Sequence, residues 1–186
     1  PDGDAITALT ANVSSLPPGN DGDFSPGSGN TIGILTWTPT YNDAGVYSVS
    51  FTATNALTGT TTTTITVTNS DRAPLVSAPG TVTVAETGVL SVTVHAVDPD
   101  GNAITSLTAN LAGLPAGHNA VFTPGPGDSI GTLTWTPTYN DSGSRSVSFT
   151  AGNALSGSAT TLIRVTNVDR APTVSASDAA LAEGWT

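Results

Sequence analysis

Residues 35–43 read Leu-Thr-Trp-Thr-Pro-Thr-Tyr-Asn-Asp, and residues 133–141 repeat this stretch letter for letter. The offset between the two copies is 133 − 35 = 98 residues. The same offset relates the tetrapeptide Asp-Arg-Ala-Pro at residues 71–74 to its second copy at residues 169–172. A period of about 100 residues is too long for a solenoid repeat and matches a whole small domain. The sequence therefore predicts a tandem array of one domain.

The offset also predicts where the domains begin and end. Residues 1–71 form a repeat that lacks its first two strands, residues 72–169 form a complete repeat, and residues 170–186 supply the first strand of a following repeat. The chain begins with Pro1, without Met and within a repeat, so we expect it to be a segment of a longer protein.

Composition narrows the class of protein. Charged residues make up 10% of the chain, against roughly 25% in average globular proteins, and Thr, Val, Gly and Pro favour strands joined by turns. The net charge is −10 and Lys is absent, which argues against binding to nucleic acid or to anionic membranes. No apolar run approaches the roughly 20 residues of a membrane-spanning helix. Because Cys is absent, disulfides and thiolate metal sites are excluded.

Hydrophobic residues alternate with polar ones along the complete repeat. Leu90, Val92, Val94 and Ala96 share one side of a stretch whose other side is mostly polar, a pattern typical of a half-buried strand. The predicted strands cover residues 74–77, 81–84, 89–97, 104–111, 121–123, 132–136, 144–151 and 161–165. Short strands with turns every 8 to 12 residues predict an all-β fold of tandem immunoglobulin-like antiparallel β-sandwiches.

Aromatic residues have predicted structural roles in this sandwich. Trp37 and Trp135 alternate in step with the apolar Leu35 and Leu133, so we expect both tryptophans in the core. The two tyrosines of the repeated stretch, Tyr41 and Tyr139, precede the penultimate strand of their repeats and are candidates for a tyrosine corner.

Two stretches resemble the cadherin family. Residues 92–102, Val-Thr-Val-His-Ala-Val-Asp-Pro-Asp-Gly-Asn, follow Glu86 and are similar to the cadherin pattern of a Glu followed by a strand ending in Ala-x-Asp-x-Asp-x-x-Asn. Residues 165–172 resemble the linker between cadherin repeats. The Leu-Pro-x-Gly, Leu-Thr-Trp-Thr-Pro and Phe-Thr-Ala blocks resemble bacterial cadherin-like, dystroglycan-type and Ig tandem repeats of large surface and haemagglutinin-like proteins. The resemblance covers the whole chain and implies a secreted, cell-surface protein.

This resemblance implies calcium sites between domains, because cadherins hold Ca²⁺ there with carboxylates from both domains and from the linker. Clustered Asp, Asn and Glu oxygens are suitable ligands for this ion. The implied ligands at the junction between the two repeats are Asp43, Asn69, Asp71, Asp98 and Asp100. Those at the next junction are Glu86, Asp141, Asn167 and Asp169, and Asp2 and Asp4 would serve a preceding one. Arg72 and Arg170 stand where cadherin linkers carry another oxygen ligand, so we expect one calcium ion per junction or none.

Catalytic residues are not evident. Of the two histidines, His118 corresponds to Asn20 in the other copy and the position equivalent to His95 precedes residue 1, and no nucleophile, base and orienting group recur together. We therefore expect a non-enzymatic, extracellular structural or adhesive repeat of a stalk, adhesin shaft or filament. Its partners would be neighbouring repeats or identical subunits, and a cell-surface or glycan receptor.

Two alternatives remain open. In the first, residues 172–186 complete the first repeat of another subunit, which gives a head-to-tail fibre. In the second, the repeats are carbohydrate- or protein-binding accessory domains of a secreted enzyme, for which Trp185 is an available aromatic residue.

Overall fold

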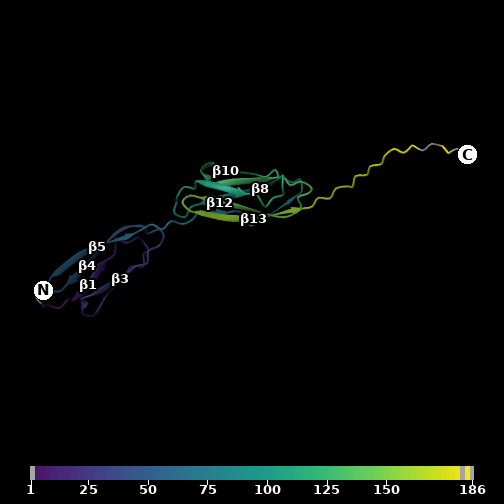
Figure 1. Cartoon of the computed structure of the whole chain (residues 1–186). Coiled ribbons are helices and arrows are strands. Elements are labelled where there is room, and N and C mark those ends of the chain that lie inside the picture. Colours follow the sequence, from purple (N-terminus) through teal and green to yellow (C-terminus); the bar gives the residue numbers. More distant parts are fainter. Residues whose placement is uncertain (1–2, 181–182, 185–186) are drawn as a thin grey trace. The chain divides into compact units, whose positions relative to one another are not determined.

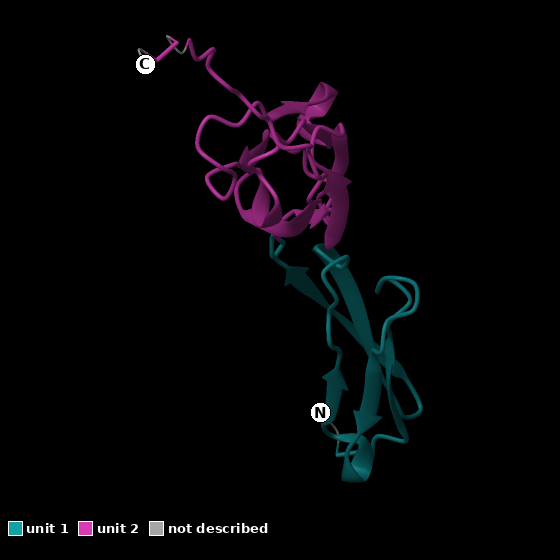
Figure 2. Ribbon diagram, turned by 90° about the vertical axis from the view of Figure 1, so that its right-hand side faces the viewer, with its two compact units in different colours: residues 1–72 teal, residues 73–186 magenta. Residues whose placement is uncertain are grey.

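The alternating stretches of the sequence form strands in the computed structural model, which describes residues 3–180 and 183–184 (Figure 1). The chain forms two units, Pro1–Arg72 and Ala73–Thr186, which Figure 2 shows in different colours. The helical structure of the described residues consists of two short 3₁₀ turns, η1 (Ser28–Asn30) and η2 (Pro126–Asp128). In this part of the chain no helix has the length and apolar character of a membrane span. The predicted all-β class is confirmed.

Unit 2 is a sandwich of two four-stranded sheets. Its strands are β6 (Leu75–Ser77), β7 (Thr81–Ala85), β8 (Leu90–Val97), β9 (Ser106–Asn110), β10 (Val121–Pro124), β11 (Ile130–Trp135), β12 (Gly143–Gly152) and β13 (Ser156–Thr166). One sheet has the order β10-β11-β8-β6 and the other has the order β7-β13-β12-β9. All pairs are antiparallel except β7 and β13, which run parallel. The segment with Pro79 and Gly80, between the predicted strands 74–77 and 81–84, therefore separates two strands that join opposite sheets.

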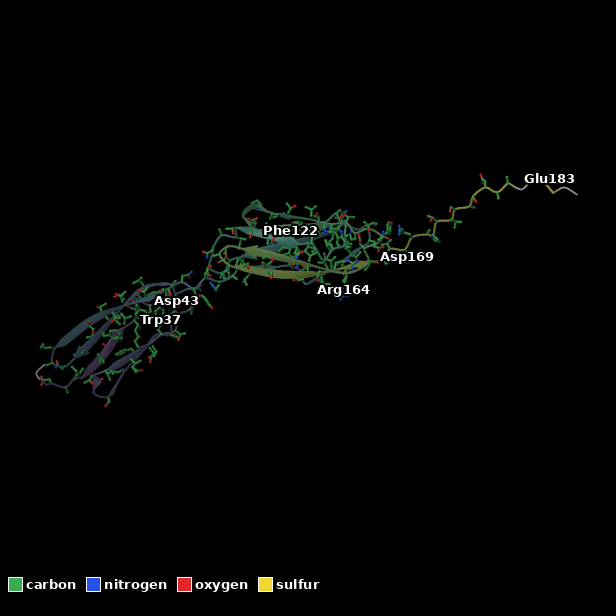
Figure 3. All side chains as sticks on the ribbon, viewed as in Figure 1. Trp37, Asp43, Phe122, Arg164, Asp169 and Glu183 are labelled. Carbon is green, nitrogen blue, oxygen red and sulfur yellow. The ribbon has the colours of Figure 1, made fainter. Side chains whose placement is uncertain are left out.

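The core of unit 2 lies between the inward faces of the two sheets. Trp135 is 2% exposed, and Leu133, Phe149 and Ile163 are fully buried. The rings of Phe122 and Phe149 pack with centroids 5.4 Å apart, and Figure 3 labels Phe122. The buried face of β8 is the one expected from its period of two, with Leu90, Val92, Val94 and Ala96 inward. Local alternation thus correctly assigned the core of the complete repeat.

Unit 1 has the same strand order over a shorter stretch. Its strands are β1 (Ala8–Asn12), β2 (Asp23–Pro26), β3 (Gly33–Thr36), β4 (Gly45–Thr54) and β5 (Thr58–Val67). They form one sheet of order β1-β4-β5 and a two-stranded sheet of β2 and β3. Among the described residues of this unit there is no counterpart of β6, β7 or β8.

The open side of unit 1 changes the environment of its apolar residues. Leu35, Trp37, Ile65 and Val67 are half-buried, whereas their counterparts 98 residues later are buried. All four line an open cavity of about 400 Å³. Trp37 is therefore only partly in the core, contrary to the expectation for both tryptophans, because nothing equivalent to β7 and β8 covers it.

The segment after β13 is exposed. Residues 169–180 and 183–184 form no strand, and residues 169–180 are exposed to solvent. The assignment of residues 170–186 to the first strand of a following repeat stays a prediction, and residues 181–182 and 185–186 of that segment lie outside the described part of the chain. Asp2 and Trp185 lie outside it as well.

Candidate functional site

The implied calcium ligands of unit 2 fall at opposite ends of its sandwich. Asp98 and Asp100 follow the last residue of β8, beside the turn that joins β12 to β13. Glu86 follows β7 and lies next to the end of β13, where its backbone N–H donates to Thr166 O at 3.0 Å. The eleven residues of β13 separate these two places. We call the first the entry end and the second the exit end of unit 2.

At the entry end, Asp98 is fully engaged by donors from its own unit. Its Oδ1 accepts hydrogen bonds from the backbone N–H of Asp100 at 2.8 Å and of Asn102 at 3.3 Å. Its Oδ2 accepts one from Nδ2 of Asn153, 55 residues away in sequence, at 2.7 Å. The carboxylate is 6% exposed, so these bonds satisfy a group that would be costly to bury alone. Asp98 therefore fastens the turn after β8 to the turn after β12.

The surroundings of Asp98 act on its pKa in opposite directions. Burial alone would raise the pKa of this carboxyl, and the nearby charge of Asp100 also raises it. The hydrogen bonds from Asn153, Asp100 and Asn102 stabilise the ionised form and lower the pKa. The hydrogen bonds prevail, and the pKa of Asp98 lies below its ordinary value of 3.8.

At the exit end, Glu86 is the most deeply buried acidic side chain, with 2% of its surface exposed. Its Oε2 accepts a hydrogen bond from the backbone N–H of Val168 at 2.9 Å. Its Oε1 is buried and has no hydrogen-bond partner among the described residues. The exit end therefore retains a carboxylate oxygen with unused acceptor capacity, unlike the carboxylate of Asp98.

Asp43 and Asp141 stabilise the same turn in the two units. Asp141 Oδ2 accepts from the backbone N–H and the hydroxyl of Thr138 at 2.6 and 2.8 Å. Asp43 Oδ2 accepts from the corresponding groups of Thr40 at 2.7 and 2.9 Å. Both aspartates are buried. Through these hydrogen bonds each closes the turn that precedes a long strand. Figure 3 labels Asp43 in unit 1 and Asp169 beyond β13 in unit 2.

The remaining implied ligands lie in the linkers. Asn167 Nδ2 donates to Asp169 Oδ1 at 2.8 Å, and both residues are exposed. Asn69 is exposed and Asp71 is half-buried. Within the described residues, no group of three or more His, Asp or Glu side chains is placed to hold a metal ion. Whether ligands from unit 1 join Asp98 and Asp100 stays a prediction.

Each linker arginine stacks on a tyrosine of the unit that it follows. The guanidinium carbon of Arg72 lies 5.0 Å from the centre of the Tyr41 ring, and that of Arg170 lies 4.4 Å from the centre of the Tyr139 ring. These distances are those of cation–π contacts. Arg72 also approaches Asn42 Oδ1, at 3.5 Å. The sequence identified the arginines as departures from the cadherin pattern, but it did not reveal their partners.

The tyrosine corner lies elsewhere than predicted. Tyr47, not Tyr41, donates its hydroxyl hydrogen to the backbone carbonyl oxygen of Asp43 at 2.8 Å. The position equivalent to Tyr47 in unit 2 is Arg145, whose Nη1 donates to Ser144 O at 3.1 Å. The prediction was wrong because Tyr41 and Tyr139 recur exactly, whereas the residue that makes the contact differs between the copies.

Comparison with known proteins identifies the family. The family described as bacterial Ig domain matches residues 71–166, which is 96 of the 186 residues. The chain belongs to the bacterial Ig domain family. No match was found among curated protein sequences.

Several solved structures are similar to this bacterial Ig protein at low identity. Endo-fucoidan hydrolase MfFcnA4 from glycoside hydrolase family 107 is 22% identical over 87% of this chain and 24% of its own, with a TM-score of 0.39. The M1 domain from titin is 15% identical over 53% of this chain and 100% of its own, with a TM-score of 0.39. Domains 4–9 of surface layer protein SbsC are 14% identical over 89% of this chain and 22% of their own, with a TM-score of 0.40. The chain thus spans about a quarter of the fucoidan hydrolase.

The lowered pKa of Asp98 predicts a loss of stability in acid. The contribution of this carboxylate to the free energy of unfolding of the Ig unit is complete above pH 3.8 and is lost as the pH falls through the folded-state pKa. Urea unfolding of unit 2 between about pH 2 and 6 measures this change. In Asn153→Ala the main hydrogen bond that lowers the pKa is gone, so the acid-induced loss attributable to Asp98 should become smaller. Identical pH profiles for the two proteins would contradict the prediction.

Proposed function

We propose that the chain is a non-enzymatic, extracellular segment of a linear array of bacterial Ig domains, which forms a stalk, adhesin shaft or filament. The observation that carries this proposal is that both units have the same exit structure. In each, a buried Asp closes a Thr-Tyr-Asn-Asp turn, and the linker Arg stacks on the Tyr of that turn. A repeated exit structure is what a series of equivalent joints requires.

The linker chemistry supports a restricted joint. Pro74 and Pro172 lie two positions after the stacked arginines, and proline fixes φ and disfavours helical backbone in the residue before it. The arginine contact limits the first linker residue, and the proline limits the third. Neighbouring repeats of the same chain or identical subunits are accordingly the proposed partners, and a cell-surface receptor would be bound by the array as a whole.

The proposed extracellular location follows from the resemblance to repeats of bacterial surface proteins, and the composition shows that the fold would need no disulfides there. The chain has a net charge of −10 and neither Lys nor Cys, so its fold depends on packing and on hydrogen-bonded turns instead of disulfides. The array would not bind nucleic acid, because phosphate recognition needs clustered basic residues.

The structural role and a carbohydrate-binding role make different predictions for a glycan array. Sugar platforms need exposed aromatic faces, but Trp135 is buried, and Arg170 occupies one face of the Tyr139 ring although Tyr139 is 39% exposed. We expect the 186-residue chain to show no retention above background on plant, algal and animal glycans. Retention that is lost in Tyr139→Ala would instead support an accessory binding domain.

Calcium is a further part of the proposal, and the two ends of unit 2 fit this ion unequally. Asp98 already accepts three hydrogen bonds, whereas Glu86 Oε1 is buried without a partner among the described residues. A hard oxygen of this kind suits Ca²⁺, which takes six to eight oxygen ligands. The side chains of Glu86, Asp141, Asn167 and Asp169 belong to the same end but are not grouped around a metal position in the described structure, so they would have to move together to hold the ion. Asp98 and Asp100 would contribute less than the cadherin resemblance implies.

A calcium site at the exit end predicts a melting temperature that depends on calcium. At about a hundredfold excess over Kd, binding to the native state alone adds about 2.7 kcal/mol to the free energy of unfolding. We expect the calcium-dependent rise to disappear in Glu86→Gln and to persist in Asp98→Asn, whatever each change does to the metal-free protein. Thermal unfolding with calcium and with chelator measures both. If the unmodified chain has the same melting temperature in both buffers, the calcium site is contradicted and the array would be independent of metal.

The open side of unit 1 favours a second candidate, a head-to-tail fibre. The cavity lined by Leu35, Trp37, Ile65 and Val67 is covered in unit 2 by β7 and β8. The segment at residues 172–180 is exposed and corresponds by the repeat to β6 and the approach to β7. This segment of another copy would pair with the open edge of unit 1. It lacks an equivalent of β8, so it would cover only part of the cavity.

The fibre hypothesis predicts association that increases with concentration. Val174 is equivalent to the half-buried Val76 of β6, which packs against the core in unit 2, so Val174→Asp would place a charge on the face of the segment that should pack against unit 1. Light scattering on the unmodified chain should then show oligomers that Val174→Asp abolishes. A monomer at all concentrations, or oligomers that this variant leaves intact, would reject the fibre and leave the array of covalently linked domains.

A further inference from the structure

The segment that enters unit 2 and the strand that leaves it lie side by side. β7 pairs with β13 in parallel, in a register that runs from Thr81 opposite Leu162 to Ala85 opposite Thr166. Both strands are therefore directed from the entry end to the exit end. The pair covers the last five residues of β13, and β13 itself runs from the entry end to the exit end, as the reader can follow in Figure 1.

Hydrogen bonds outside this register extend the pair at its beginning. Leu162 N–H donates to Gly80 O at 3.0 Å, and the hydroxyl of the fully buried Thr161 donates to Pro79 O at 2.7 Å. A Cβ atom at Gly157 would collide with the carbonyl oxygen of Pro74, so the entering chain lies directly against the start of β13.

Glu86 extends the pair at the other end. Its backbone N–H donates to Thr166 O at 3.0 Å, and its Oε2 accepts from Val168 N–H at 2.9 Å. One buried side chain thus fastens the residue after β7 to the chain beyond the end of β13. A hydrogen bond to an ionised acceptor is stronger than one between neutral groups.

The direction of the strands determines how tension would act on these bonds. Pulling on the chain before β6 draws β7 back toward the entry end, while pulling beyond Val168 draws β13 toward the exit end. The two strands are then displaced in opposite directions along their own axes. Tension therefore loads all the bonds between them together, whereas a strand pulled from one end of a hairpin would lose them one after another.

We propose that the β7–β13 pair is the tension-bearing element of unit 2 and that Glu86 is the residue that locks its exit end. This inference rests on the proposed role in a linear array, where tension is transmitted from one domain to the next. A carboxylate that is 2% exposed and has one unpartnered oxygen is a poor source of equilibrium stability, because its desolvation offsets most of what the bond contributes. We expect the main effect of Glu86 to be kinetic, because its hydrogen bond must break before tension can pull β7 and β13 apart.

Asp98 provides a matched control. It is also a buried carboxylate that accepts backbone N–H groups, but it lies at the entry end and contacts neither β7 nor β13 in any hydrogen bond described above. Loss of Asp98 removes three hydrogen bonds and should lower the free energy of unfolding measured in denaturant, whereas loss of Glu86 should change this free energy less. Only loss of Glu86 should weaken the pair that carries the load.

Single-molecule force spectroscopy on the whole chain, held at its two ends in the presence of chelator, tests this proposal. Extension by roughly 300 Å identifies the unfolding of unit 2, at about 3.5 Å for each released residue. At constant force we expect Glu86→Ala to unfold about tenfold faster than the unmodified chain, the factor expected for losing one hydrogen bond to a charged group. We expect Asp98→Ala to unfold within about twofold of the unmodified rate, because its bonds are not loaded in shear.

Thr161→Val keeps the test decisive if Glu86→Ala does not fold. It removes the hydroxyl that bonds to Pro79 O with little change of shape and should also accelerate unfolding under force several-fold. Equal acceleration by the Glu86 and Asp98 variants, or no acceleration by Glu86→Ala and Thr161→Val, would overturn the proposal. Because the measurement needs neither calcium nor a ligand, a failed calcium titration or a positive glycan array would leave its result unaffected.

Discussion

The structure of the complete unit depends on one crossing between its two sheets. β7 belongs to the sheet that contains β13, and β8 belongs to the sheet that contains β11, although only the short turn at residues 86–89 separates them. This crossing brings Val84 to the core from one sheet and Leu90 from the other. The crossing has no counterpart among the described residues of unit 1. Trp37 and Ile65 of that unit are half-buried, whereas their identical counterparts in unit 2 are buried.

Two of the four buried acidic groups among the described residues join separate parts of the chain, and the other two close local turns. Asp141 closes a turn with a residue three positions away, but Asp98 reaches across 55 positions to Asn153 and Glu86 across 82 positions to Val168. Burying a carboxylate without partners is costly, so each of these groups favours the arrangement that supplies its donors. In a chain with few charges, such groups therefore contribute more to fixing which loops meet than to the net stability of the fold.

The sequence allowed the strands and the core of unit 2 to be predicted because these depend on local alternation. The inward face of β8 and the burial of Trp135 follow from a period of two within a few residues. The contacts of Asp98 and Glu86 could not be predicted, because their partners are set by the pairing of distant strands. The tyrosine corner was missed for a different reason. The repeat directed attention to residues shared by both copies, whereas Tyr47 is replaced by Arg145 in the second.

The linker arginines could stabilise the joints between the domains of such an array. A guanidinium group remains charged throughout the physiological pH range, so its contact with the Tyr139 ring does not depend on protonation or on the supply of a metal ion. The same positive charge lies two residues beyond Val168, the residue that Glu86 holds, and it would oppose a second cation bound nearby. Both repeats carry the arginine at the same position and stack it on the equivalent ring. The Arg–Tyr contact thus fixes the direction in which each linker leaves its unit, and it does so without a metal ion. A calcium ion at the exit end would stabilise this arrangement further.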